Sequence, residues 1–256
     1  MKVKSITIAF FSPTGNTRKY LKEMTSESGH PVKILDMTLP KYDHQQTFVF
    51  DDLVVVGAPV YGGRIPTVAM ERFTKLKGNN TPCIVLACFG NRAFDDSLLE
   101  LAELFRKNGF VIYGAAGVVG RHTYGSIQVD RPNKKDLQEA KNFFTRVMNN
   151  SSAEPRVSIP GNIPFVAQGS KGRFFPTTDI SVCRKCSMCV QLCPTGAIAQ
   201  DCMTIDSEKC LSCFRCIRNC PAKAKQMTST TYREFAEMLS KKLEEPKENV
   251  FFYPEE

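Results

Sequence analysis

The segment SITIAFFSPTGNT, residues 5–17, decides how the first half of the chain folds. Its first part is almost entirely apolar, which is typical of a β-strand in a buried sheet. Its second part, SPTGNT, is small and polar around Gly15, and it leads into a stretch that favours a helix. A strand, a tight polar turn and a helix in succession predict the start of a βαβ unit.

The same alternation continues to about residue 150. Five strands are predicted at 5–11, 32–35, 52–58, 82–89 and 110–119, and four helices at 16–25, 66–75, 94–108 and 134–148. The third strand contains LVVVGA, whose unbroken apolar character indicates burial on both faces. Residues 1–150 are therefore predicted to form an α/β domain around a five-stranded parallel sheet, while residues 37–50 have no legible pattern.

The composition is that of a globular protein, because 42% of the 256 residues are hydrophobic and can form a buried core. The formal net charge of +8 is scattered along the sequence, so we expect no nucleic acid as partner. No run approaches the roughly 20 apolar residues of a membrane helix, and the N-terminus lacks the pattern of a signal peptide. We expect a cytoplasmic protein that does not bind membranes.

The remaining chain is divided by its composition. Residues 151–178 are rich in Ser, Pro and Gly and form a connector, which apolar residues such as Ile159 and Phe174 predict to pack across the first domain. Residues 229–256 are predicted to form a C-terminal helix and tail. Thr231 and Glu234 predict a capping box at the start of that helix, whose apolar face would cover one domain or the seam between both.

Between them lies a repeat of cysteines, with 9 of the 11 cysteines of the chain between positions 183 and 220. CRKCSMCVQLCP at 183–194 and CLSCFRCIRNCP at 210–221 share the spacing C-x2-C-x2-C-x3-C-P, with every cysteine offset by 27 residues. In such runs three closely spaced thiolates bind one iron–sulfur cluster, and the cysteine before proline ligates the other. The predicted ligands are Cys183, Cys186, Cys189 and Cys220 for one 4Fe-4S cluster, and Cys210, Cys213, Cys216 and Cys193 for the second.

Zinc and a disulfide framework are the alternatives for this repeat. Zinc sites usually combine paired C-x2-C units, and disulfide frameworks are typical of exported proteins, so both fit less well. Residues 179–228 resemble bacterial two-cluster ferredoxins, which implies a C-terminal α+β ferredoxin-like domain with two 4Fe-4S clusters. The second copy departs from that pattern in PAKAK, with Lys223 and Lys225, and Cys202 is surplus to the eight ligands and is predicted to be a bystander.

The SPTGNT turn has the chemistry of a phosphate site. A Walker loop would place a lysine after its glycine, whereas Asn16 follows Gly15 here, so nucleotide hydrolysis is not expected. The hydroxyls of Ser12, Thr14 and Thr17, the backbone amides of the turn and the positive end of the next helix suffice for one terminal monophosphate.

A strand followed by this turn resembles the FMN phosphate loop of flavodoxins, over roughly residues 3–148. The resemblance implies a doubly wound sheet with strand order 2-1-3-4-5 and FMN at the carboxyl ends of its strands. Two further loops fit that place, APVYGGRIP at 58–66 and CFGNRAFDD at 88–96. The residues predicted to bind FMN are Ser12, Thr14, Gly15, Asn16, Thr17, Pro59, Val60, Tyr61, Gly62, Gly63, Phe89, Gly90, Asn91, Arg92 and Phe94.

The aromatic residue that stacks on the flavin ring is left open, because the chain has no Trp. Tyr61, Phe89 and Phe94 are the candidates. Asn91 and Arg92 are expected to offer donors to the flavin carbonyls.

Together, the three loops and the cysteine repeat resemble the fusions of flavodoxin and ferredoxin known as EFR-type ferredoxins. The resemblance implies an iron–sulfur flavoprotein that carries electrons between the clusters and FMN, converting one-electron to two-electron transfer for a redox partner protein. If the flavin and the nearest cluster lie far apart in one chain, a homodimer is expected.

The alternative is an FMN-dependent reductase of a small acceptor such as a quinone, a nitroaromatic compound or an oxygen species. His122 would then be a catalytic proton donor, with Tyr124 and Arg64 lining the pocket. The competing interpretation of His122 is a loop histidine without chemistry, and a third function, a redox sensor, has no positive support in the sequence.

Overall fold

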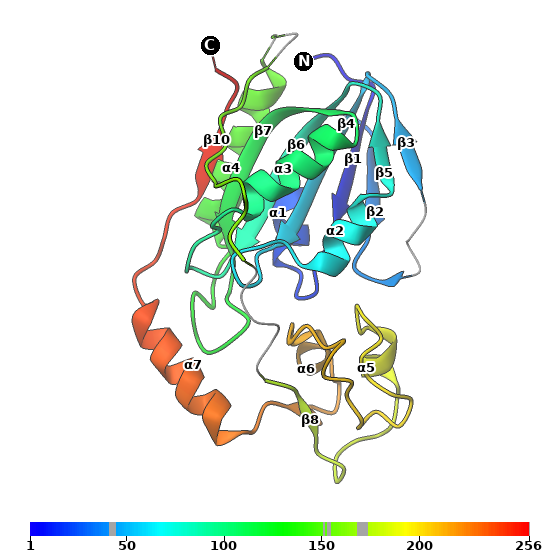
Figure 1. The fold of residues 1–256 in the computed structure, drawn as a ribbon, viewed down its shortest axis with the longest axis vertical. Helices are drawn as coiled ribbons and strands as arrows, with labels where there is room; N and C mark the ends of the chain where they lie inside the picture. The colour runs from blue at the N-terminus through cyan, green and yellow to red at the C-terminus, as the bar shows by residue number, and fades with distance from the viewer. Residues whose placement is uncertain (41–44, 151, 153–154, 168–173, 256) are drawn as a thin grey trace.

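The computed structural model describes residues 1–40, 45–150, 152, 155–167 and 174–255. A six-stranded sheet forms its larger part (Figure 1). From one edge to the other, its strands are β10 (Val250–Phe252), β7 (Phe110–Val119), β6 (Thr81–Phe89), β4 (Asp52–Pro59), β1 (Ser5–Phe10) and β2 (Val32–Asp36).

Five of these strands are parallel and follow the order predicted from the sequence. Taken in chain order, β1, β2, β4, β6 and β7 lie in the sequence 2-1-3-4-5, which is the flavodoxin-like doubly wound arrangement. Their bounds differ from the predicted ones by no more than one residue at either end. The predicted α/β fold with this sheet is therefore confirmed.

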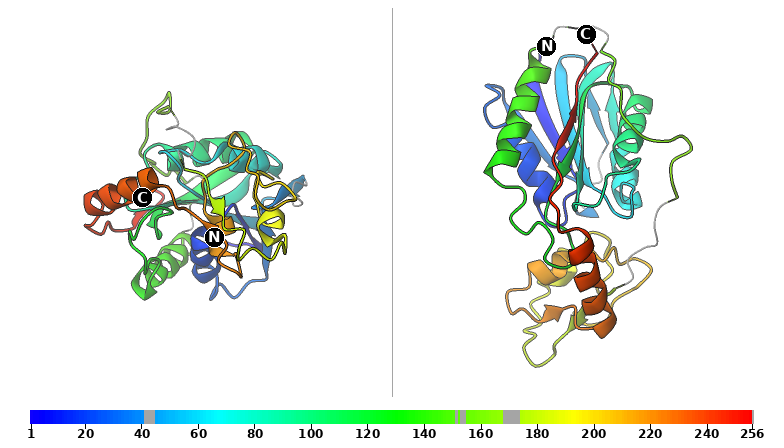
Figure 2. Two further views of the ribbon diagram at one scale, coloured as in Figure 1. Left: turned by 90° about the horizontal axis from the view of Figure 1, so that it is seen from below. Right: turned by 90° about the vertical axis from the view of Figure 1, so that its left-hand side faces the viewer.

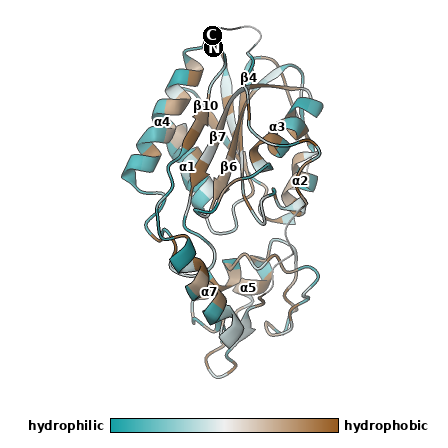
Figure 3. Ribbon diagram, turned by 60° about the vertical axis from the view of Figure 1, so that its left-hand side comes forward, coloured by the Kyte–Doolittle hydropathy of each residue, from teal (hydrophilic) through white to brown (hydrophobic). Residues whose placement is uncertain are grey.

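Helices cover both faces of the sheet (Figure 2). The helices that flank it are α1 (Asn16–Met24) and α4 (Lys134–Met148) on one face, and α2 (Thr67–Phe73) and α3 (Ser97–Lys107) on the other. Along β4, Val54 and Val56 join the core under α2 and α3, while Leu53 and Val55 join the core under α1 and α4. Alternate residues thus face opposite cores, which is why this strand is apolar throughout. Figure 3 shows the same division, with hydrophobic strands inside and hydrophilic outer helix faces.

Three short strands packed with the α/β domain were not predicted. β3 (Gln46–Phe48) pairs in parallel with β5 (Leu76–Gly78) in a separate two-stranded sheet, and of these two only β3 lies within residues 37–50, which had no legible pattern. β10 pairs antiparallel with β7 and extends the main sheet by one edge strand. Phe251 of β10 stacks on Phe143 of α4, with ring centroids 5.0 Å apart, so the last strand is held by the core as well as by the ladder.

The cysteine-rich region lies beyond the carboxyl ends of β1, β4 and β6 (Figure 1). Its regular elements are the antiparallel pair β8 (Thr177–Thr178) and β9 (Lys225–Gln226), and the single-turn helices α5 (Met188–Gln191) and α6 (Arg215–Arg218). Each short helix belongs to one copy of the cysteine motif.

The C-terminal helix α7 (Thr230–Lys242) begins earlier than predicted. Its N-cap is Ser229, whose hydroxyl accepts a hydrogen bond from the Tyr232 amide at 3.2 Å. The predicted capping box at Thr231 and Glu234 is wrong, because both residues already lie inside the helix. After α7 the chain returns to the sheet and forms β10, so residues 229–256 connect the two parts of the molecule (Figure 2).

The connector crosses the outside of α3 in its described residues. Asp96 accepts hydrogen bonds from the amides of Asn162 at 2.9 Å and Val166 at 2.6 Å. Ile159 packs against the core as predicted, whereas Ile163 is 73% exposed. The rest of the predicted connector includes 151, 153–154 and 168–173, which lie outside the described residues. Among the described residues, no helix combines the length and the apolar character that crossing a bilayer requires.

Asn249, just before β10, anchors the returning tail. Its Oδ1 accepts hydrogen bonds from the Val119 amide at 2.9 Å and the Tyr20 hydroxyl at 3.2 Å. Its Nδ2 donates to Glu139 Oε2 at 2.7 Å and Asp136 Oδ1 at 3.0 Å. We predict that Asn249→Ala lowers the free energy of unfolding by about 2 kcal/mol, since partly buried partners lose their hydrogen bonds.

Urea unfolding of the intact protein measures this effect. Asn142→Ala is the matched control, because the Asn142 side chain is exposed on α4 and accepts only from Gln138. We expect the control to change the unfolding free energy by less than about 0.5 kcal/mol. Equal effects of the two substitutions would contradict the anchoring role of Asn249.

Candidate functional site

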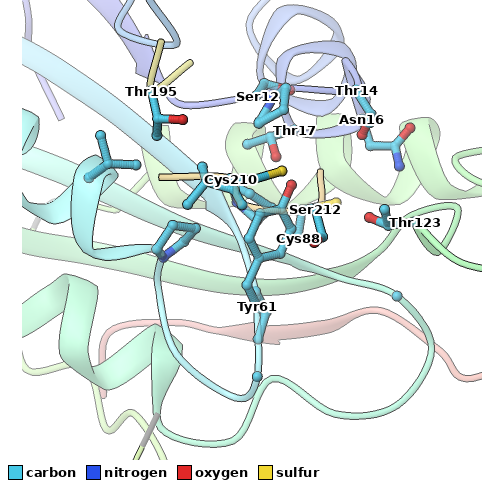
Figure 4. A pocket seen from close by; sticks show the side chains of 18 of the residues that line it. Ser12, Thr14, Asn16, Thr17, Tyr61, Cys88, Thr123, Thr195, Cys210 and Ser212 are labelled. Carbon is cyan, nitrogen blue, oxygen red and sulfur yellow. The ribbon is translucent and has the colours of Figure 1, made fainter. Parts of the chain in front are cut away.

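A cavity of about 940 Å³ opens at the carboxyl ends of β1, β4 and β6. This volume lies at the upper end of the range for small-molecule sites. Loops of the α/β domain form most of its wall, as Figure 4 shows for Ser12, Thr14, Asn16, Thr17 and Tyr61. The cysteine-rich region and α7 close the cavity with Thr195, Glu208, Lys209, Cys210, Leu211, Ser212 and Phe235.

The SPTGNT turn forms one wall of the cavity. Ser12 Oγ accepts a hydrogen bond from the Arg18 amide at 3.1 Å, which leaves the hydroxyl hydrogen of Ser12 free to donate. Gly15 is the N-cap of α1 with φ 91°, a left-handed conformation that suits glycine. Gly15 has no side chain to cap α1, and Ser12 accepts from the amide of Arg18, so the amides of Asn16 and Thr17 and the positive end of the helix dipole could face an anion bound in the loop. The hydroxyl side chains of Thr14 and Thr17 line the cavity beside this helix end.

A tight hairpin turn at residues 61–64 forms the second wall. Tyr61 N donates to Arg64 O at 2.9 Å, and Arg64 N donates to Tyr61 O at 3.3 Å. Gly62 and Gly63 both have positive φ, 61° and 85°, as a type I′ turn requires. Figure 4 shows Tyr61 extending into the cavity toward Thr17. Burial raises the pKa of Tyr61 well above its ordinary value, so its phenol stays neutral.

Other residues of this segment divide between the cavity and the surrounding packing. Pro59, Val60 and Gly62 line the cavity, whereas Gly63 does not. A Cβ on Gly63 would lie 2.5 Å from Asp95 Oδ2, so the glycine permits close packing of two loops.

The loop after β6 contributes fewer cavity residues than predicted. Phe89 and Gly90 line the cavity, but Phe94 packs edge-on against Phe89 and Phe252. Arg92 forms an ion pair with Asp95 and also lies outside the lining. Gly15 also lies outside the lining, and its role in the structure is that of the N-cap of α1.

Asn91 has a different role from the predicted one. It is fully buried, and its Nδ2 donates to Leu243 O and Glu245 O, both at 2.8 Å. Its Oδ1 accepts from the Lys247 amide at 2.7 Å. These bonds hold the segment after α7, so the Asn91 side chain is not directed at the cavity.

The loop after β7 brings His122 into the cavity wall. His122 Nδ1 lies 2.9 Å from the Tyr124 amide nitrogen and 3.1 Å from the Tyr124 carbonyl oxygen, so the backbone of Tyr124 holds the ring in place. Burial, assisted by the charges of Arg218 and Arg92, lowers the pKa of His122 below its ordinary value. The ring is therefore mostly neutral at pH 7. A side chain at Gly90 would overlap the imidazole, so that glycine makes room for it.

Of the other two residues assigned to a reductase pocket, only Tyr124 lines the cavity. Arg64 instead donates to both carboxylate oxygens of Glu100, at 2.8 and 2.5 Å, and to Val166 O at 2.7 Å. Its guanidinium also lies over the ring of Phe165. The expectation that Arg64 lines the pocket is wrong, because its donors hold α3 and the connector.

The eight motif cysteines border two hollows. The first is lined by Cys183, Cys186, Cys189 and Cys220, and the second by Cys193, Cys210, Cys213 and Cys216. These are the same two groups of four that the sequence spacing predicts, while cluster binding itself stays a prediction. None of the eleven cysteines, all of which are among the described residues, forms a disulfide. Cys202 is buried and lines the first hollow as a fifth cysteine.

The two copies of the motif repeat their backbone conformation as well as their spacing. Lys185 and Ser187 have φ of 51° and 57°, and Ser212 and Phe214, 27 residues later, have φ of 50° and 59°. Left-handed residues between right-handed ones turn successive amides toward one side, which favours a bound anion such as a cluster with its thiolates.

Backbone amides also approach the two cysteines that precede proline. Ala197 N donates to Cys193 Sγ at 3.2 Å. Burial acts to raise the pKa of Cys220, but hydrogen bonds from the amides of residues 222–225 lower it overall. In the second hollow, burial raises the pKa of Cys213 and of Cys216 to about 12, so their thiolates need a compensating cation.

A single metal ion fits these hollows poorly. Within the described part of the chain, no three His, Cys, Asp or Glu side chains are close enough to share one ion. Four cysteines around one hollow would suit a cluster, in which the thiolates bind different metal atoms.

The second hollow and the large cavity share a wall. Thr195, Cys210, Leu211 and Ser212 line both spaces. Among the described residues, the lining of the first hollow has none in common with the lining of the cavity. Of the two hollows, the second is therefore the one that adjoins the cavity.

Arginine side chains fix this arrangement. Arg215 of α6 donates from Nη1 to Pro13 O at 2.8 Å and Ser12 O at 3.3 Å, in the SPTGNT turn. Arg72 of α2 donates from Nη2 to Pro194 O at 2.7 Å, beside Cys193. These bonds join the cysteine motifs directly to the α/β domain.

The sequence did not reveal the residues with which the cysteine-rich region closes the cavity. Leu211 and Ser212 stand in the first x2 gap of the second motif, where spacing predicts only cluster ligation. Their place in the cavity wall follows from domain packing, for which the sequence carried no signal.

No protein-family model matches the chain. The chain is 25% identical over 143 residues to an uncharacterized protein of Methanocaldococcus jannaschii, covering 53% of this chain and 91% of the relative. Among solved structures, a flavodoxin from the domain Archaea aligns with a TM-score of 0.41 and 15% identity, over 56% of this chain and 95% of that chain. Oxidised flavodoxin 2 from Bacillus cereus aligns with a TM-score of 0.43 and 16% identity, over 56% of this chain and 97% of that chain. The fold assignment rests on the order and direction of the strands, and not on these similarities.

Proposed function

We propose that the chain is an iron–sulfur flavoprotein that carries electrons between two 4Fe-4S clusters and FMN for a redox partner protein. The observation that carries this proposal is the wall that the cavity shares with the second cysteine hollow. A flavin exchanges one or two electrons whereas a cluster exchanges one, so the combination links one-electron to two-electron transfer.

The cavity offers groups that suit both the phosphate and the flavin ring of FMN. Ser12, Thr14 and Thr17, with the amides at the start of α1, would hold the phosphate without a lysine. Tyr61 and Phe89 line the cavity and remain candidates to contact the ring, whereas Phe94 is held in the core.

The cysteine hollows fit clusters through their donor sets. Four thiols line each hollow, backbone amides approach Cys193 and Cys220, and Cys186 is exposed. The exposed side of the first hollow would be the point where an external one-electron carrier protein delivers or removes an electron. Because the cavity and the second hollow meet within one chain, this proposal needs no second copy of the chain.

A reductase of a small acceptor is the second candidate function. The size of the cavity favours it, since about 940 Å³ leaves room beside a flavin, and the neutral His122 and Tyr124 line the same space. Either function uses the same residues for FMN and for the clusters.

Turnover separates the two candidates. The holoprotein is given a low-potential reductant with quinone, nitroaromatic compound or oxygen, and separately with candidate one-electron carrier proteins. We expect rapid exchange with carrier proteins and slow turnover of small acceptors. Sustained fast turnover of one small acceptor, lost in His122→Ala, would favour the reductase and contradict the carrier.

The phosphate turn is tested by the pair Thr14→Ala and Thr17→Ala. Each hydroxyl bond to a phosphate contributes about 1.5 kcal/mol, so we predict that the double variant binds FMN about 100-fold more weakly. Quenching of FMN fluorescence by flavin-depleted protein measures the affinity, and the cluster absorbance is expected to stay unchanged. Thr145→Ala on the exposed face of α4 is the control, and equal FMN affinity in all three proteins would contradict the assignment.

The crossed grouping of cysteines is tested by double variants. Cys193 and Cys213 border the same hollow, so Cys193→Ala with Cys213→Ala is predicted to lose one cluster, the same loss as either single variant. Cys193→Ala with Cys186→Ala is predicted to lose both clusters, because these residues border different hollows. Iron content and EPR of the reduced protein provide the readout. The opposite pattern would overturn the grouping, and Cys202→Ala is expected to keep both clusters.

A further inference from the structure

Lys225 is a buried lysine beside the cysteine hollows. Its side chain is 2% exposed, and its Nζ makes no hydrogen bond to any described residue. It lines the first hollow together with Cys183, Cys186, Cys189 and Cys220. A buried ammonium without a partner is costly, so its position indicates that a negative charge normally lies close to it.

The backbone holds Lys225 in this orientation from two sides. Lys225 pairs with Thr178 in the β8–β9 ladder, and its amide donates to the Cys220 thiol. Because neighbouring side chains of a strand point to opposite faces, Gln226 is exposed while Lys225 is buried. Lys223, two residues earlier in the same PAKAK segment, is also exposed.

The geometry places Lys225 at the first hollow, among four of the motif cysteines. Asp201 is a nearby carboxylate, but it is exposed to solvent and is therefore a weak counter-ion for a buried ammonium. The charge of Lys225 is thus available to a negatively charged group bound in the first hollow.

We propose that Lys225 is the counter-ion of the cluster in the first hollow and sets the reduction potential of that cluster. This inference rests on the proposed function. A 4Fe-4S core of charge +2 with four thiolates has charge −2, and each one-electron reduction adds a further negative charge. A fixed cation in a medium of low dielectric stabilises the reduced form more than the oxidised form, and it therefore raises the potential. The electron comes from the external one-electron carrier protein of the proposed function.

Redox titration of the holoprotein, followed by EPR, tests this role. Lys225→Met removes the charge but keeps the length of the side chain, and we expect the reduction equilibrium of the cluster in the first hollow to shift at least about tenfold toward the oxidised form. For a one-electron couple, a tenfold shift is 59 mV. Lys225→Arg keeps the charge and should restore potentials close to those of the unaltered protein. Lys223→Met removes an exposed charge from the same segment and should shift the potentials much less.

The outcomes separate this inference from the proposed function. An unchanged potential of the cluster in the first hollow, with the iron content unchanged, would overturn the role of Lys225 while leaving the electron carrier intact. An equal shift in Lys223→Met would show a general charge effect and would overturn it too. If Lys225→Met assembles no clusters, Lys225→Gln allows the same comparison with a polar, uncharged side chain. Absence of iron–sulfur clusters from the unaltered protein would instead contradict the proposed function.

Discussion

The contact that the rest of the site depends on is the pair of hydrogen bonds from Arg215 to the carbonyls of Ser12 and Pro13. Arg215 stands between Cys213 and Cys216 in the second cysteine motif, and the two carbonyls belong to the turn before α1. One guanidinium therefore fixes a cysteine hollow relative to the place where a phosphate would bind. Arg72 adds a second link at Pro194, next to Cys193, so both ends of the second hollow are attached to the α/β domain.

These links turn two separate sequence patterns into one structure. A parallel sheet leaves a crevice at the carboxyl ends of its strands, where loops alone would leave the ligand open to solvent. Here the cysteine-rich region closes that crevice, and Leu211 and Ser212 separate the cavity from the second hollow. The first hollow includes the exposed Cys186. In the proposed electron carrier, the shared wall is the place where an electron passes between the second cluster and the flavin.

Sequence reasoning succeeded where local pattern and physical requirement coincide. The side chains of Leu53–Val56 alternate between two cores, so every residue of the run must be apolar. The strand could therefore be predicted from its sequence. The cysteine spacing specified two groups of four, and the same groups line the two hollows. The SPTGNT turn predicted the start of a helix, and in the structure Gly15 is the N-cap of α1 in a left-handed conformation that suits glycine.

Most of the predictions that failed depended on partners far away in the sequence. Asn91 was expected to offer a donor to the flavin and Arg64 to line a reductase pocket, but Asn91 holds the segment after α7, and Arg64 holds Glu100 and the connector. β10 is three residues long, and it is a strand because it pairs with β7 at the edge of the sheet. The wrong cap of α7 has a local cause. Ser229, Thr230 and Thr231 follow one another, each can cap a helix, and the sequence did not show that Ser229 is the N-cap. Contacts across more than 100 residues leave no periodic trace in the sequence.

The most direct test of the account is the concentration dependence of electron passage from the clusters to the flavin. A photochemical one-electron donor reduces the clusters of the holoprotein, and the flavin absorbance is followed over a wide range of protein concentration. The shared wall at Cys210 and Ser212 predicts a first-order rate constant that does not change with protein concentration. A rate that rises in proportion to protein concentration would mean that electrons pass between molecules, and it would contradict transfer within one chain.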